Sequence, residues 1–197
     1  MGLFAERGYQ STTVGQIEQA AGLSPRAGAF YKHFSGKQDV LDACIDAWVG
    51  DIAAFALAQD ANPDDTEVGL AAVAVGSFAI LDRQRELFRF LHRDGQRFPA
   101  ITSRVHEQLV QFGYRELAGR FARIAGRRRN DPEIRALAAI GLGSLVHHLE
   151  DDLRYGAPPA DSQRAPLVKV WARTMHLALR DLAGDATASE PSVESPE

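Results

Sequence analysis

The segment Ser11–Leu41 constrains the fold most, because helix-start signals follow one another closely along it. Thr13 and Gln16 have the spacing of a capping box, in which each side chain bonds the backbone N–H of the other residue. Ser24 followed by Pro25 is a second start signal, since proline at the first helical position gives up an N–H that would be unpaired anyway. The sequence therefore predicts two short helices in quick succession.

A third start signal and an intervening turn complete this pattern. Ser35 and Gln38 repeat the capping-box spacing in front of a longer stretch with helical apolar periodicity. Gly22 ends the first helix, because glycine tolerates the left-handed conformation common at helix ends. Two helices joined by a tight turn that contains glycine predict a helix-turn-helix, with the helix from Pro25 presented outward.

The residues AERGYQSTTV, IEQAAGLS and FYKHFSGKQDVL, in this order, resemble the N-terminal signature of the TetR (TetR/AcrR) family of bacterial transcription regulators. The resemblance covers about the first quarter of the chain. It implies an all-α homodimer in which a helix-turn-helix domain precedes a larger helical domain that binds an effector and weakens DNA binding. The chain departs from the usual form in its short helix before Gly8 and in two additional residues within PRAGAF.

The candidate DNA contacts are Thr12, Thr13, Arg26, Tyr31, Lys32, His33 and Lys37. Thr12 or Thr13 could offer a hydroxyl and a backbone N–H to a phosphate at a helix start. In the family pattern the residues that match Tyr31 and Lys37 hold the DNA backbone, and such contacts position the protein without reading sequence. Arg26 is the candidate base reader, because arginine can bind guanine bidentately. Packing for Tyr31 and an ordinary surface position for Lys32 and His33 are the alternatives.

The net charge of −4 looks unfavourable for DNA binding, but the acidity is unevenly distributed. The stretch from Gly184 carries four acids and no base, so the rest of the chain is neutral. Within the first 38 residues, four basic side chains outnumber two acidic ones. A surplus of +2 per subunit is modest, so we expect useful DNA affinity to require a dimer.

Helical periodicity continues through the rest of the chain. The expected helices are Gln38 to about Gln59, VGLAAVAVGSFAIL, LFRFLHR, Ile101 to about Ile124, Pro132–Tyr155 and Leu167–Leu182. Asp131 should cap the helix that Gly156 ends. The acidic stretch 184–197 should be disordered. The predicted domains are 1–41 for DNA binding, 42–183 for effector binding and dimerisation, and 184–197 as an acidic tail.

Aromatic residues gather in the middle of the sequence and predict an effector pocket. The candidate contacts are Phe78, Phe88, Phe112 and Tyr114. Ligand pockets are mainly apolar with a few orienting polar groups, although a place in the core is the alternative for any single phenylalanine. The last two predicted helices have wide apolar faces, which predict a four-helix bundle across a two-fold axis.

Several other classes of protein are less favoured. There is no glycine-rich phosphate loop after a strand and no nucleophile with a plausible base, so we expect no enzymatic activity. His147 and Asp151 could share a helix face as metal ligands, but no third ligand is evident, so we expect neither metal nor cofactor. No apolar run approaches the roughly 20 residues that span a bilayer. The lone Cys44 fits a reducing cytoplasm, where we expect the protein.

The sequence thus predicts a ligand-responsive repressor that binds a palindromic double-stranded DNA operator as a homodimer. A small, largely apolar effector of unknown identity would release it. The alternative is a helical small-molecule-binding protein with weakened or lost DNA binding.

Overall fold

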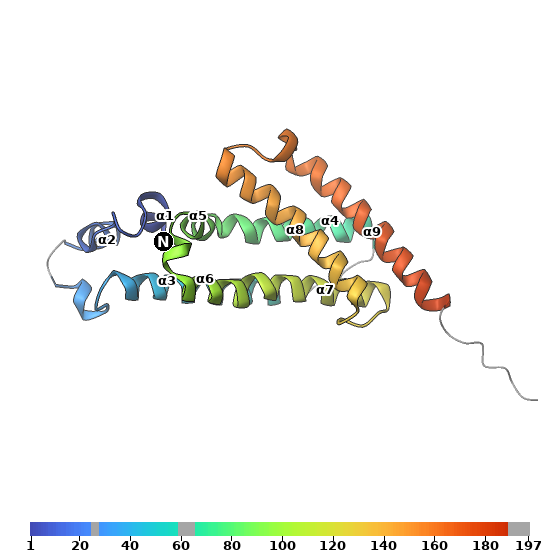
Figure 1. Ribbon diagram of the computed structural model, residues 1–197, viewed down its shortest axis with the longest axis horizontal. Helices are drawn as coiled ribbons and strands as arrows, with labels where there is room; N and C mark the ends of the chain where they lie inside the picture. The colour runs from blue at the N-terminus through green and yellow to red at the C-terminus, as the bar shows by residue number, and fades with distance from the viewer. Residues whose placement is uncertain (25–27, 59–65, 189–197) are drawn as a thin grey trace, which may run out of the picture. The chain divides into compact units, whose positions relative to one another are not determined.

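A computed structural model of the chain, shown in Figure 1, describes residues 1–24, 28–58 and 66–188. These ranges contain helices and turns and no strand, which confirms the predicted all-α class. The chain forms two compact units. Unit 1 comprises Met1–Gln59 and Ile80–Gln111, and unit 2 comprises Asp60–Ala79 and the chain from Phe112 onward. The predicted functional division at residue 41 stays a prediction, because a compact unit need not coincide with a DNA-binding segment.

Unit 1 contains the N-terminal helices and a second run of helices from the middle of the chain. Its elements are α1 (Gly2–Arg7), α2 (Val14–Ala20), the 3-10 turn η1 (Phe30–Lys32), α3 (Lys37–Ala58), α5 (Arg85–Asp94), the 3-10 turn η2 (Gly95–Arg97), α6 (Pro99–Val105) and the π-helical turn η3 (His106–Val110). α4 (Glu67–Arg83) begins in unit 2 and ends in unit 1. α3 lies beside α6, and α1 packs on α5.

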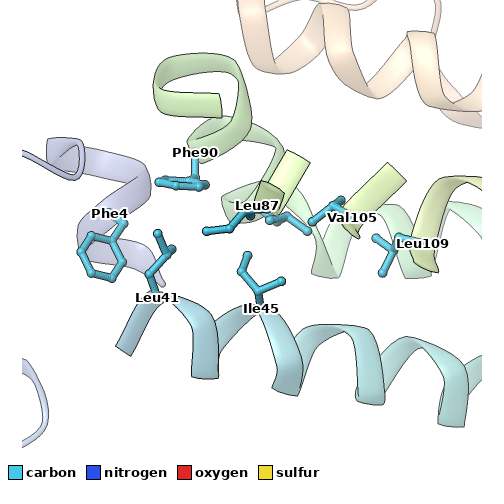
Figure 2. Close-up of a cluster of buried hydrophobic side chains, with 8 residues drawn as sticks. Phe4, Leu41, Ile45, Leu87, Phe90, Val105 and Leu109 are labelled. Atoms are coloured by element: carbon cyan, nitrogen blue, oxygen red, sulfur yellow. The ribbon is translucent and has the colours of Figure 1, made fainter. Parts of the chain in front are cut away.

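A buried apolar cluster joins these helices. Figure 2 shows side chains from α1, α3, α5, α6 and η3 converging on one space: Phe4, Leu41, Ile45, Leu87, Phe90, Val105 and Leu109. Leu41 and Phe90 are completely buried. Because an isolated helix as short as α1 is not stable in water, the contact of Phe4 with this cluster keeps α1 folded.

Local sequence signals set both ends of α2. The predicted capping box is confirmed: the Thr13 N–H donates to the Gln16 side chain at 2.9 Å, and the Gln16 N–H donates to the Thr13 hydroxyl at 3.3 Å. Gly22 ends the helix as predicted, with φ of 72°. The Leu23 N–H then donates to the Glu18 carbonyl at 2.8 Å, as in a Schellman motif.

The predicted capping box between Ser35 and Gln38 is wrong. The backbone N–H and the hydroxyl of Ser35 donate instead to the Asp39 carboxylate, at 2.8 and 2.6 Å. A carboxylate is a stronger acceptor than the neutral amide of Gln38, and these bonds lower the pKa of Asp39. α3 accordingly begins at Lys37.

Unit 2 consists of the first part of α4 and the C-terminal helices. These are α7 (Gln111–Ala125), whose first residue belongs to unit 1, α8 (Pro132–Tyr155), the 3-10 turn η4 (Pro159–Asp161) and α9 (Arg164–Ala188). The predicted ends of α8 are confirmed: the Asp131 carboxylate accepts the Glu133 N–H at 2.9 Å, and Gly156 has φ of 73°. The predicted helix Ile101–Ile124 is interrupted by η3.

α8 and α9 lie side by side in Figure 1 and approach closely at Gly141. The Trp171 indole N–H donates to the Gly141 carbonyl at 2.8 Å. A Cβ at Gly141 would lie 3.2 Å from the Met175 sulfur and 3.3 Å from the Trp171 ring, so both side chains would have to shift to admit it. α9 continues past its predicted end at Leu182 to Ala188, so 184–188 is helical rather than disordered. The remainder of the predicted tail, 189–197, lies outside the described residues.

Replacing Leu41 with alanine should lower the free energy of unfolding by about 2–5 kcal/mol, because the side chain is fully buried and its removal leaves a cavity. The control is Val68→Ala, at a side chain that is 80% exposed, which should change it by less than about 0.5 kcal/mol. Urea unfolding at one fixed protein concentration measures both values. Equal losses for the two variants would show that the cluster does not stabilise unit 1.

Candidate nucleic-acid interface

The candidate interface consists of the α1–α2 turn (Gly8–Thr12), α2, η1 and the first residue of α3. Tyr31, Lys32 and His33 are all exposed, and Tyr31 retains 65% of its surface. The buried Phe30 holds them outward, with its ring packed edge-on against that of Tyr31 at 5.2 Å between centroids. Their exposure leaves their side chains able to contact a phosphate backbone.

The predicted recognition helix differs from the structure. Pro25, Arg26 and Ala27 lie outside the described residues, so the base contact of Arg26 stays a prediction. From Gly28 onward the backbone forms a bend followed by the three-residue turn η1, and the α-helix predicted there is wrong. Gly28 explains the difference, because its φ of 76° is not compatible with a right-handed helix.

The two candidate threonines have different environments. Thr12 is fully buried, and its single O–H donates to the Gly8 carbonyl at 2.8 Å, with the Leu3 carbonyl also within 3.2 Å of the hydroxyl oxygen. That hydroxyl is therefore bound inside unit 1 and not presented to a phosphate. Thr13 is exposed at the start of α2 and stays a candidate contact.

Lys37 makes internal contacts that the sequence does not predict. Its Nζ donates to three backbone carbonyls of the α1–α2 turn: Tyr9 at 2.7 Å, Thr12 at 2.9 Å and Gln10 at 3.2 Å. An ammonium has three N–H donors, so these bonds occupy all of them. The phosphate contact predicted for Lys37 would require at least one of these bonds to break.

Tyr9 is a residue of this region that sequence reasoning missed. Its backbone N–H donates to the Asp94 carboxylate at 3.0 Å. Its ring stacks on Phe4 at 5.6 Å and meets Phe98 edge-on at 4.7 Å between centroids. The Lys37 ammonium lies 4.5 Å from the ring centroid, within range of a cation–π interaction. An aromatic residue directly after the Gly8 helix stop was the only local signal.

α5 also holds the end of α1. The Arg93 guanidinium donates to the Glu6 carbonyl at 2.5 Å and more weakly to the Ala5 carbonyl at 3.4 Å. Cationic donors at a helix C-terminus satisfy carbonyls that have no partner within the helix. Arg93 and Asp94 of α5 therefore hold the end of α1 and the beginning of the α1–α2 turn, whereas Lys37 holds the same turn from α3.

The predicted effector contacts do not all fall in one unit. Phe78, Phe112 and Tyr114 belong to unit 2, whereas Phe88 belongs to unit 1. Phe78 is 4% exposed, and the other three are half-buried. Their binding of an effector stays a prediction.

Phe78 lies next to His148 of α8. The two rings meet edge-on at 5.5 Å, and the Arg164 guanidinium lies 4.8 Å from the Phe78 ring centroid. His148 is 5% exposed, with Nδ1 3.4 Å from the Ser162 hydroxyl. Burial lowers the pKa of His148, the positive charge of Arg164 lowers it further, and Asp152 opposes both effects.

The described residues also bear on a metal site and on a membrane span. His147 Nε2 lies 3.6 Å from Asp151 Oδ2 on α8, as an ion-pair geometry. Within the described ranges no three His, Cys, Asp or Glu side chains are grouped closely enough to hold a metal ion. In the same ranges, no helix has both the length and the apolar character needed to cross a membrane.

Two comparisons with known proteins found similarities. Residues 1–44 match the family described as bacterial regulatory proteins, tetR family. Over 80 residues the chain is 32% identical to the HTH-type transcriptional repressor KstR2 of Rhodococcus jostii (strain RHA1). That match covers 41% of this chain and 38% of KstR2, so the chain spans well under half the length of this relative. The family match includes every element of the candidate interface.

The pKa of His148 predicts how unit 2 responds to acid. Because this pKa lies below the ordinary value of 6.5, the unfolded chain binds the proton more readily than the folded chain does. The corresponding stability is present above pH 6.5 and is lost as the pH falls from there through the pKa of the folded state. Between about pH 7.5 and about pH 5.5, His148→Gln should lose less unfolding free energy than the wild type.

His147→Gln is the matched control, because the neighbouring His147 side chain is 66% exposed. It should keep the pH dependence of the wild type. Thermal unfolding followed by circular dichroism across this pH range measures all three proteins. Identical pH profiles for His148→Gln and the wild type would contradict the assignment.

Proposed function

We propose that the chain is a repressor of the TetR family, which its residues 1–44 match, and that it binds operator DNA as a homodimer and is released by a small effector. The observation that carries the proposal is the agreement between the family match and the exposed run Tyr31–His33. The similarity to KstR2, a transcriptional repressor, supports repression over activation.

In this proposal one group of side chains contacts phosphates and another side chain contacts a base. Tyr31, Lys32 and Thr13 hold phosphates, because all three are exposed in the candidate interface. Arg26 reads a base, as its position near the beginning of the predicted recognition segment suggests. His33 is exposed beside Lys32 and is a further candidate for DNA contact.

The surfaces of α8 and α9 support a homodimer. Large apolar side chains are exposed on both helices: Ile140 at 64%, Val170 at 63% and Leu177 at 58%. The last two are separated by seven residues on α9, so they lie on the same face of that helix. Pairing of these faces across a two-fold axis would bury them in a four-helix bundle.

Contacts between α6 and α3 offer a way for an effector to act on the candidate interface. The Arg104 guanidinium on α6 lies 3.0 Å from the Asp46 carboxylate and 3.6 Å from that of Asp42, both on α3. α3 also carries Lys37 and so reaches the candidate interface directly. An effector that binds better to a state with α6 displaced would therefore shift α3 and release the operator.

The alternative, a helical small-molecule-binding protein without DNA affinity, makes a different prediction for DNA binding. The repressor reading predicts a gel shift on DNA flanking the protein's own gene that withstands an excess of unrelated DNA. Arg26→Ala should relax selectivity, with a loss of about 1–3 kcal/mol confined to operators that carry the preferred base. Lys32→Ala should weaken binding to all sequences alike. Absence of any sequence-selective shift for the wild type would favour the alternative.

Leu177→Glu should convert the dimer to a monomer at micromolar concentration, because two carboxylates would be buried at the pairing face. Lys169→Glu, an exposed charged position on the same helix, is the control and should remain dimeric. Sedimentation velocity on both variants measures the association. A monomeric wild type would contradict the four-helix pairing.

A further inference from the structure

We propose that Lys37 is a positioning residue of the candidate interface, which acts by holding the α1–α2 turn and not by contacting DNA. This inference rests on the proposed function only where its test measures DNA binding. The turn itself can be examined in the free protein.

Three carbonyl oxygens of the α1–α2 turn lie close together and are stabilised by a cationic donor. The Thr12 N–H donates to the Tyr9 carbonyl at 3.4 Å, so the chain folds back tightly here. This geometry brings the carbonyl oxygens of Tyr9, Gln10 and Thr12 within hydrogen-bond distance of a single point. Converging carbonyl dipoles repel one another, and partly buried carbonyls need donors. The Lys37 ammonium supplies one N–H to each.

The bound geometry leaves Lys37 little freedom. Besides its three hydrogen bonds, the ammonium lies over the Tyr9 ring, and the side chain is only partly exposed. A phosphate would have to displace a carbonyl that is already fixed by the turn. A flexible, exposed lysine such as Lys32 offers its charge to DNA without that cost.

The turn that Lys37 holds leads directly into α2 of the candidate interface. Thr12 is the last residue of the turn, and Thr13 is the cap of α2. Lys37 is also the first residue of α3. The three hydrogen bonds therefore fix the entry of α2 relative to the start of α3, with η1 in the chain between them. Loss of these bonds should misplace the interface as a whole.

Two substitutions separate positioning from phosphate contact. Lys37→Met removes the charge and retains an unbranched side chain. Lys37→Arg retains the charge, but a planar guanidinium cannot donate to three converging carbonyls in the same way, whereas it binds phosphate well. Lys32→Met is the matched control, because it removes an exposed lysine from the same interface.

The experiment measures affinity of the full-length protein for DNA flanking its own gene between about 50 and 300 mM salt. Positioning predicts that Lys37→Met and Lys37→Arg both bind about tenfold more weakly at every salt concentration, with the wild-type slope of log affinity against log salt. A phosphate contact predicts that Lys37→Met lowers this slope by roughly 0.9 per subunit and that Lys37→Arg binds like the wild type. The second pattern would overturn the proposal.

Hydrogen exchange in the free protein provides the independent readout. The amides of Thr12 and Gln16, which are hydrogen-bonded in the turn and the α2 cap, should exchange about tenfold faster in Lys37→Met than in the wild type. They should be unchanged in Lys32→Met. Unchanged exchange in Lys37→Met would overturn the positioning role. Faster exchange without any DNA binding by the wild type would retain that role in the fold and refute the proposed function.

Discussion

The packing of α3 against α1, α5 and α6 is the constraint on which unit 1 depends. α1 has six residues and α2 has seven, and helices this short do not persist in water without tertiary contacts. Leu41 and Ile45 supply those contacts from α3, and Leu87 and Phe90 supply them from α5. The segment that matches the TetR family therefore shares its core with helices from the middle of the chain, because a chain of that length buries too little apolar surface alone.

This shared core has a consequence for regulation. The α1–α2 turn is held by Lys37 of α3 from one side and by Asp94 of α5 from the other. The same two helices contribute to the apolar cluster, so a displacement of α5 relative to α3 would strain both polar anchors at once. Polar anchors require good geometry, whereas apolar contacts tolerate sliding. The turn is therefore the part of unit 1 most sensitive to such a displacement.

Local signals in the sequence correctly predicted the capping box of α2 and both ends of α8, whereas contacts between residues distant in sequence were not predicted. The Thr13 capping box and the Asp131 cap involve partners two or three residues away, so their spacing is visible in the sequence. The hydrogen bond between Lys37 and Tyr9 joins residues 28 positions apart, and no sequence pattern predicts it. Gly28 shows a second limit of prediction from sequence. A glycine can adopt helical or left-handed backbone angles, and only the structure shows that its φ is 76°. The candidate interface stays a prediction, and only the fold shows which of its side chains are bound inside unit 1 and which are exposed.

The internal use of Lys37 changes the electrostatic argument for a dimer. The first 38 residues carry four basic side chains, and the structure commits one of them to backbone carbonyls. Its charge still contributes to the field around the protein, but it neutralises no phosphate directly while those bonds persist. In the proposed complex with DNA, the candidates for direct ionic contact are then Lys32, Arg26 and Arg7. So few contacts per subunit give weak binding at physiological salt. In the proposed homodimer, a second subunit held at a fixed spacing would double the contacts and add the geometric selectivity that a single interface of this size lacks.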